Sequence, residues 1–128
     1  MVSIDCKDDC NNAPRKALLR DLNISFARGD VEEILSRLSE DILWRMVGDR
    51  EIQGKPRVRE VLTAMADQQA RELHIHHIIT HGAQAALDGV MLFQDGSRVS
   101  FCDVYIFSGH SKTAKIKEII SYNSKIGG

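Results

Sequence analysis

The stretch Phe101-Cys102-Asp103-Val104-Tyr105-Ile106-Phe107 is the most strand-like run of this chain. Aromatic and β-branched residues dominate it, as is typical of strands. Because successive side chains of a strand point to opposite sides, the odd-numbered residues share one face and the even-numbered residues share the other. The stretch therefore predicts a strand with two largely apolar faces, and Asp103 stands where an apolar side chain is expected.

Three helices are predicted upstream of this strand. The first begins at Pro14 and ends at Gly29, and the second is capped by Asp30. The third opens at Pro56 and extends to about Arg71. Apolar residues recur at helical spacing in each helix, namely Leu18, Leu19, Leu22 and Phe26, then Val31, Ile34, Leu35 and Leu38, then Val58, Val61, Leu62 and Met65.

Five segments are predicted to be strands. They cover residues 42–47, 73–81, 83–94, 98–107 and 115–123. Gly89 indicates a bulge or bend within the third of them, and Asp95-Gly96 is typical of a hairpin. Four consecutive strands after the helices predict an α+β fold with a mostly antiparallel sheet.

The length of 128 residues predicts one domain, covering residues 13–124. Residues 1–12 are polar and carry no periodicity, so we expect an N-terminal tail, and residues 125–128 are expected to form a C-terminal tail. The net charge is −1, with 17 basic and 18 acidic residues, and no patch of one sign stands out. We therefore expect neither nucleic acid nor a membrane as a partner.

Cys6, Cys10 and Cys102 are an odd number of cysteines, which favours free thiols in a reducing cytoplasm. The N-terminus has neither the basic region nor the apolar core of a signal peptide, which agrees with a cytoplasmic location. Cys6 and Cys10 lack the second pair of ligands that a zinc site needs. The sequence also lacks nucleotide and dinucleotide motifs, so we predict no metal and no cofactor.

In this order, the motifs resemble the nuclear transport factor 2-like superfamily, which includes the SnoaL-like polyketide cyclases and the ketosteroid isomerases. The resemblance covers roughly residues 14–124. It rests on Ala27-Arg28-Gly29-Asp30, Ser39-Glu40-Asp41 leading to Trp44, Gly54, and Cys102–Phe107 leading to Lys115-Ile116-Lys117-Glu118.

The resemblance implies a cone, in which a strongly curved, mixed, mostly antiparallel sheet wraps around three N-terminal helices and encloses a deep pocket. Members of the superfamily commonly dimerise through the outer face of the sheet. This chain would do so through Cys102, Val104 and Ile106, since an outward apolar row needs a partner.

Asp103 is the main candidate for catalysis. It falls where the ketosteroid isomerases carry the aspartic acid of their oxyanion hole, an acid that an apolar site keeps protonated. Burial among Phe101 and Tyr105 should raise the pKa of Asp103 in the same way. The alternative is a structural carboxyl that pairs with a nearby Arg, His or Tyr.

Two other catalytic positions of the isomerases are not matched. Their tyrosine falls at Leu22 or within one residue of it, and their general base falls near Met46, which takes no proton. Asp49 lies near the latter position but is expected in a solvated turn. Steroid isomerase activity is therefore not predicted.

Several residues are expected to line the pocket and bind the substrate. Trp44 and Tyr105 combine a flat apolar ring with a hydrogen-bonding group, although each could equally be a core residue. The sequence does not decide which face of the last strand points inward, so one set or the other of its residues lines the pocket. The candidate substrate-binding residues are Trp44, Met46, Phe101, Tyr105, Ser121 and Asn123.

His74 and His76 share a strand face, but no third ligand stands at a telling distance, so a metal is not predicted. We expect one histidine to pair with Asp103 or another pocket group, because a His–Asp pair is a workable acid/base couple. His76 is the first candidate for this second catalytic role.

Two interpretations of function remain open. The first is an enzyme that performs cofactor-free proton transfer, such as isomerisation, cyclisation or hydration, on a small, mostly apolar or ring-containing molecule. The second is a non-catalytic ligand-binding or dimerisation module of the same fold. The missing base near Met46 favours the second, and Asp103 in its aromatic setting favours the first.

Overall fold

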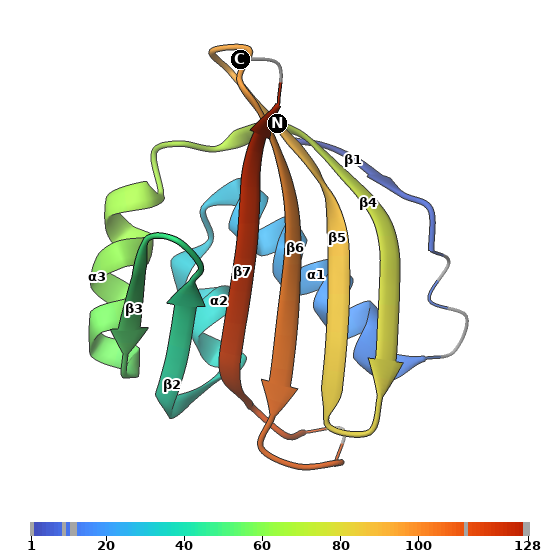
Figure 1. The fold of residues 1–128 in the computed structure, drawn as a ribbon, viewed down its shortest axis with the longest axis vertical. Coiled ribbons are helices and arrows are strands. Elements are labelled where there is room, and N and C mark those ends of the chain that lie inside the picture. Colours follow the sequence, from blue (N-terminus) through green and yellow to red (C-terminus); the bar gives the residue numbers. More distant parts are fainter. Residues whose placement is uncertain (1, 9, 11–12, 112, 127–128) are drawn as a thin grey trace.

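The structure is a computed structural model, and it describes residues 2–8, 10, 13–111 and 113–126. Within these residues the chain forms three helices and a seven-stranded mixed sheet, the expected α+β fold (Figure 1). The helices are α1 (Pro14–Arg28), α2 (Val31–Ser36) and α3 (Lys55–Met65). The strands are β1 (Ser3–Cys6), β2 (Leu38–Met46), β3 (Arg50–Gln53), β4 (Ala70–His81), β5 (Gln84–Phe93), β6 (Arg98–Phe107) and β7 (Ile116–Ile126).

The strand order of the sheet is β1-β4-β5-β6-β7-β2-β3. The pairs β1–β4 and β2–β7 are parallel, and the other neighbours are antiparallel. Helix α1 crosses behind the central strands, and α2 and α3 lie towards the β2–β3 end (Figure 1). The curved sheet and its helices form the expected cone, with β6 in the middle of the sheet.

The glycine predicted to end α1 and the aspartate predicted to cap the start of α2 are both confirmed. Gly29 follows α1 with a φ of 72°, a left-handed conformation that glycine adopts without steric cost. The carboxylate of Asp30 accepts a hydrogen bond from the backbone N–H of Glu33 at 3.4 Å, which caps α2.

The predicted ends of α2 and α3 are wrong. Leu38, assigned to the second helix, is the first residue of β2 and lies opposite Ile116 of β7. Helix α3 ends at Met65, and Arg71 already belongs to β4. In both places strand pairing competes with helical periodicity, and a short apolar spacing fits either structure.

The predicted tails also need correction. Ser3–Cys6 is strand β1, which pairs in parallel with β4 between Glu72 and Ile75. Lys125 and Ile126 belong to β7. Backbone hydrogen bonds do not require apolar alternation, so the polar sequence gave no sign of β1. Residues 1, 9, 11–12 and 127–128 of the two predicted tails lie outside the described residues.

A bulge is present beside Gly89, but it lies in β4 and not in β5 as expected, because β5 pairs with β6 in continuous register through this point. Gly89 lies opposite Ile75, and the next pair joins Asp88 to His77, so His76 is an extra residue. A Cβ atom at position 89 would lie 2.0 Å from the backbone oxygen of His74. Glycine therefore permits the close approach of β4 that accompanies this bulge.

Arg15 lies at the end of the cone where the turns after β4 and β6 are found, and it contacts both turns. Its guanidinium donates hydrogen bonds to the backbone oxygens of Gly82 at 2.7 Å and Ser111 at 2.8 Å. The same group lies 4.0 Å from the ring centre of Phe107. Because three segments meet on one side chain, the start of α1 is held against both turns.

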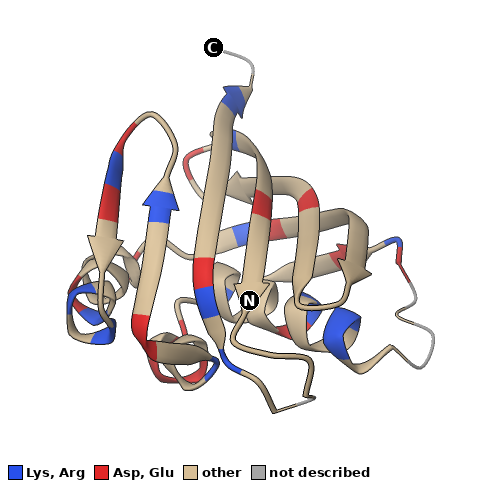
Figure 2. Cartoon of the chain, turned by 60° about the horizontal axis from the view of Figure 1, so that its bottom comes forward, with Lys and Arg blue, Asp and Glu red and all other residues tan. Residues whose placement is uncertain are grey.

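Charged residues of both signs are interspersed over the fold (Figure 2). Arg45 of β2, for example, pairs with Glu51 of β3 at 3.7 Å and with Glu118 of β7 at 3.2 Å. Among the helices that the structure describes, none is long and apolar enough to cross a membrane.

Candidate functional site

A cavity of about 210 Å³ lies between the inner face of the sheet and the helices. Apolar and aromatic side chains form most of its wall, and a few polar groups converge on it, as is usual for small-molecule sites. It is lined by Asn23, Phe26, Trp44, Met65, Met91, Phe93, Val99, Phe101, Asp103, Tyr105, Ile119, Ser121 and Asn123.

The two faces of β6 are oriented as expected. Phe101, Tyr105 and Phe107 are buried, and Asp103 lines the cavity between the first two. The even-numbered residues Cys102, Val104 and Ile106 are half-buried on the other face. Alternation along one strand therefore brings Asp103 into the cavity.

The register between β6 and β7 decides which face of the last strand points inward. Ser121 lies directly opposite Asp103, and Asn123 lies opposite Phe101. Ser121 is buried and lines the cavity together with Asn123, whereas Tyr122 between them is 49% exposed. The predicted pair Ser121 and Asn123 is thus the set that faces the cavity.

A chain of hydrogen bonds converges on the Asp103 carboxyl group. The Tyr105 hydroxyl donates to Asp103 Oδ2 at 3.3 Å and accepts from Asn23 Nδ2 at 3.0 Å. From the other side Ser121 hydrogen-bonds the same carboxyl, and its Oγ accepts from Trp44 Nε1 at 3.0 Å. Four side chains from α1, β2, β6 and β7 therefore orient one acidic group.

Desolvation raises the pKa of Asp103 to about 6, against the lowering effect of the hydrogen bonds from Ser121 and Tyr105. The residue keeps some accessible surface because it faces the cavity, while its carboxyl group lies deep among protein atoms. Burial also raises the pKa of Tyr105 well above its usual value, and the neighbouring Asp103 charge adds to this effect. Near neutral pH, Asp103 can therefore give or take a proton while Tyr105 stays a neutral donor.

Trp44 of β2 forms part of the cavity wall, and β7 separates it from β6 in the sheet. Its ring meets Phe26 of α1 edge to face, with ring centres 5.8 Å apart. It is 5% exposed, and its indole N–H donates a hydrogen bond to Ser121 Oγ. Trp44 is therefore both a packed residue and a wall, since its ring lines the cavity while its polar end is already bonded.

Two predicted site residues, Met46 and His76, do not line the cavity. Met46 packs against the core at the end of β2. His76 is the extra residue of the β4 bulge, which removes it from the pairing that would place it beside β5.

The expected pairing of a histidine with Asp103 or another pocket group is wrong for the described residues. The hydrogen-bond partners of the Asp103 carboxyl are Tyr105 and Ser121, and no described histidine lines the cavity. His74 instead contacts Glu72 at 2.9 Å and Asp5 at 3.3 Å, which raises its pKa. His77 contacts Asp88 at 2.9 Å.

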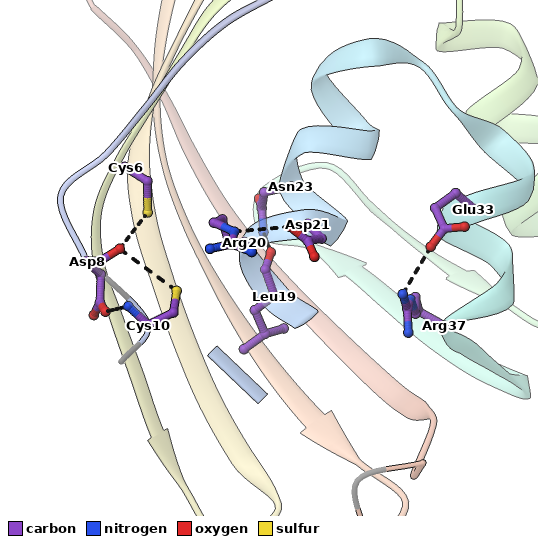
Figure 3. Close-up of polar contacts among 9 residues, drawn as sticks. All are labelled: Cys6, Asp8, Cys10, Leu19, Arg20, Asp21, Asn23, Glu33 and Arg37. Atoms are coloured by element: carbon purple, nitrogen blue, oxygen red, sulfur yellow. Dashed lines mark hydrogen bonds and ion pairs between the residues drawn. The ribbon is translucent and has the colours of Figure 1, made fainter. Parts of the chain in front are cut away.

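Asn23 is a polar cavity residue that was not predicted from the sequence. It is 1% exposed on α1, and its Nδ2 also donates to the backbone oxygen of Leu19 at 2.8 Å, a residue pair labelled in Figure 3. It lies one residue from Leu22, where the resemblance placed a polar group. A polar residue inside the apolar stripe of the helix was the available signal. The other cavity residues that were missed are Phe26, Met65, Met91, Phe93, Val99 and Ile119.

Within the described ranges, no cluster of three or more His, Cys, Asp or Glu residues could hold a metal ion. The thiols of Cys6 and Cys10 both lie beside the backbone oxygen of Asp8, at 3.2 and 3.9 Å (Figure 3). Burial raises the pKa of the Cys10 thiol, which keeps it protonated.

Solved structures with the same fold support this architecture. An NTF2-like protein of unknown function from Burkholderia xenovorans has a TM-score of 0.75 and 12% identity, covering 93% of this chain and 89% of that one. A second, from Cytophaga hutchinsonii, has a TM-score of 0.66 and 22% identity, covering 85% and 98%. The epoxide hydrolase/cyclase-like enzyme SalBIII of pyran ring formation in salinomycin has a TM-score of 0.71 and 18% identity, covering 86% and 90%.

A search of curated protein sequences finds no match. The SnoaL-like domain, in contrast, matches residues 19–118, which span the chain from α1 to β7 and include Asn23, Trp44, Asp103 and Tyr105. This match covers most of the chain and agrees with the α+β cone described above. The chain therefore belongs to the SnoaL-like domain family of NTF2-like proteins.

Proposed function

We propose that this protein is an enzyme that binds a small, mostly apolar, oxygen-bearing molecule in the cavity and moves a proton through Asp103. The observation that carries the proposal is the desolvated carboxyl of Asp103 facing an apolar cavity, with a pKa of about 6. A group with a pKa near the working pH is effective as a general acid or base. The cyclase-like function of SalBIII, a protein of the same fold, agrees with such chemistry.

The side chains around Asp103 have distinct proposed roles. In its protonated form Asp103 would donate a hydrogen bond to the ligand oxygen, and in its ionised form it would take a proton from an activated C–H bond or from water. Tyr105 and Ser121 would hold the carboxyl in place, because both already hydrogen-bond to it. The rings of Trp44 and Phe101 would pack on the apolar part of the ligand.

Deuterium incorporation from heavy water into small ketones, both cyclic and unbranched, followed by proton NMR, tests the proposal. We expect the wild-type protein to accelerate exchange at the carbon next to the carbonyl. Asp103→Asn should abolish the acceleration, and the matched variant Asp49→Asn, at an exposed turn residue, should retain it. Binding of the ketone without any acceleration would contradict enzymatic proton transfer.

The second candidate function is a non-catalytic binding module of the same fold. The observation that favours it is Met46, which lies near the position of the isomerase base and has no group that titrates. In that case Asp103→Asn would weaken ketone binding, and neither form of the protein would accelerate exchange.

We also propose a homodimer formed through the outer face of the sheet. Cys102, Val104 and Ile106 lie in a row on this face, and Ile79 on β4 is 64% exposed. A second copy would bury these apolar side chains. The free thiols of Cys6, Cys10 and Cys102 support a cytoplasmic location for this assembly.

A further inference from the structure

A second cavity, of about 110 Å³, lies next to the first and shares part of its wall. Four side chains border both cavities, namely Phe26, Met65, Met91 and Phe93. The remaining walls of the second cavity come from α2, from α3 and from the segments that follow α1 and α3. Its lining residues are otherwise Gly29, Val31, Ile34, Leu62, Ala66 and Gln68.

The shared wall is built from side chains that can move. None of its four members is fully buried, and Met65 at the end of α3 is 43% exposed. Methionine is unbranched and has several rotatable bonds, so Met65 and Met91 can change rotamer at low cost. A change of rotamer in these side chains would join the two cavities.

The size and the chemistry of the two cavities both favour a single ligand that fills them together. The first cavity is smaller than the roughly 300 Å³ at which small-molecule sites commonly begin, and the two together reach that size. Asp103 borders the first cavity, whereas among the described residues Gln68 is the one polar side chain that borders the second. A ligand that fills both would therefore need an oxygen at one end and hydrocarbon at the other.

We propose that the two cavities form one elongated site, in which the oxygen of the ligand lies at Asp103 and an apolar tail extends past Met65 and Phe26 into the second cavity. This inference rests on the proposed function, since it assumes that the polar end is bound at Asp103. It assigns the substrate to elongated hydrocarbons with one terminal oxygen function, rather than to compact single-ring compounds.

Unbranched methyl ketones of increasing length, from butanone to dodecanone, test this assignment. Binding is followed by the fluorescence of Trp44, the only tryptophan, which lines the first cavity. In the wild-type protein we expect affinity to continue rising, by about fourfold for each added methylene, after the first cavity is filled. This series needs no variant and decides the question by itself.

Ala66→Leu fills the second cavity and supplies an independent test. We expect it to weaken binding of the long ketones by at least tenfold and to leave the short ones unchanged. Ala64→Leu on the exposed side of α3 is the matched control and should bind all ketones as the wild type does. Circular dichroism confirms that both variants are folded.

The possible outcomes separate this inference from the proposed function. If short ketones bind in a way that Asp103→Asn weakens, but affinity stops rising with length, the elongated site is wrong and the role of Asp103 stands. Equal binding of long ketones by the wild type and a folded Ala66→Leu variant would likewise overturn it. Failure of every ketone to bind would overturn both proposals.

Discussion

The Tyr105 hydroxyl donates a hydrogen bond to the Asp103 carboxyl at 3.3 Å, and the two residues stand two positions apart in the same strand. Side chains at this spacing point to the same face of the sheet. Tyr105 is also the acceptor for Asn23 of α1 at 3.0 Å. Its hydroxyl group therefore links the acidic residue of the cavity to the first helix.

The burial of Asp103 predicts that the protein loses stability as the pH rises. Its pKa is about 6 in the folded chain and 3.8 in the reference state, so the folded state binds the proton more tightly. As the pH rises from below 4 to above 6, the unfolded state releases its proton first, and the free energy of unfolding falls by about 3 kcal/mol. Chemical denaturation of the wild type and of Asp103→Asn across this range measures the effect.

The informative quantity is the difference between the two stability profiles, because other titrating groups contribute equally to both. We expect the wild type to lose stability relative to Asp103→Asn between these pH values. Parallel profiles would mean that the Asp103 carboxyl has an ordinary pKa in the folded protein.

Replacement of Tyr105 by Phe should raise the pKa of Asp103 further above 6, because the hydrogen bond from Tyr105 lowers it. The change also leaves Asn23 with one acceptor fewer in a buried position, at a cost of about 1–3 kcal/mol in the free energy of unfolding. Carbon-13 NMR titration of the Asp103 carboxyl reports the pKa. Tyr122→Phe removes a hydroxyl from the exposed face of β7 and should change neither quantity.

Gly89→Ala should destabilise the fold. The new Cβ would meet the backbone oxygen of His74 at 2.0 Å, so β4 and β5 must move apart at the bulge. Overpacking of this kind costs roughly 1–3 kcal/mol or more. Thermal unfolding measures the loss, and Gly109→Ala, where a Cβ meets no atom within 4 Å, serves as the control. Equal stability of the two variants would show that the strands separate freely at the bulge.

Val104→Lys should convert the proposed homodimer into a monomer, because it places a charge in the centre of the outer apolar row. Sedimentation velocity measures the change. Thr63→Lys, on the exposed side of α3, adds the same charge away from this face and should leave the dimer intact. A wild-type protein that sediments as a monomer would rule out the proposed interface.

The sequence by itself determined the helix starts, the hairpin after β5 and the inward position of Asp103. These features depend on local signals: proline at a helix start, glycine in a turn, a capping Asp30, and alternation along a single strand. It also predicted that burial among aromatic residues would raise the pKa of Asp103, because that effect follows from the strand face.

Only the tertiary structure decided which partners Asp103 has. Asn23 lies 82 positions from Tyr105 and Trp44 lies 77 positions from Ser121, and the packing of α1 and the register of β2, β6 and β7 bring them together. The bulge in β4 likewise removed His76 from the place that simple alternation assigned to it. Strand register and helix packing depend on contacts between distant segments, whereas local signals reach only a few residues along the chain.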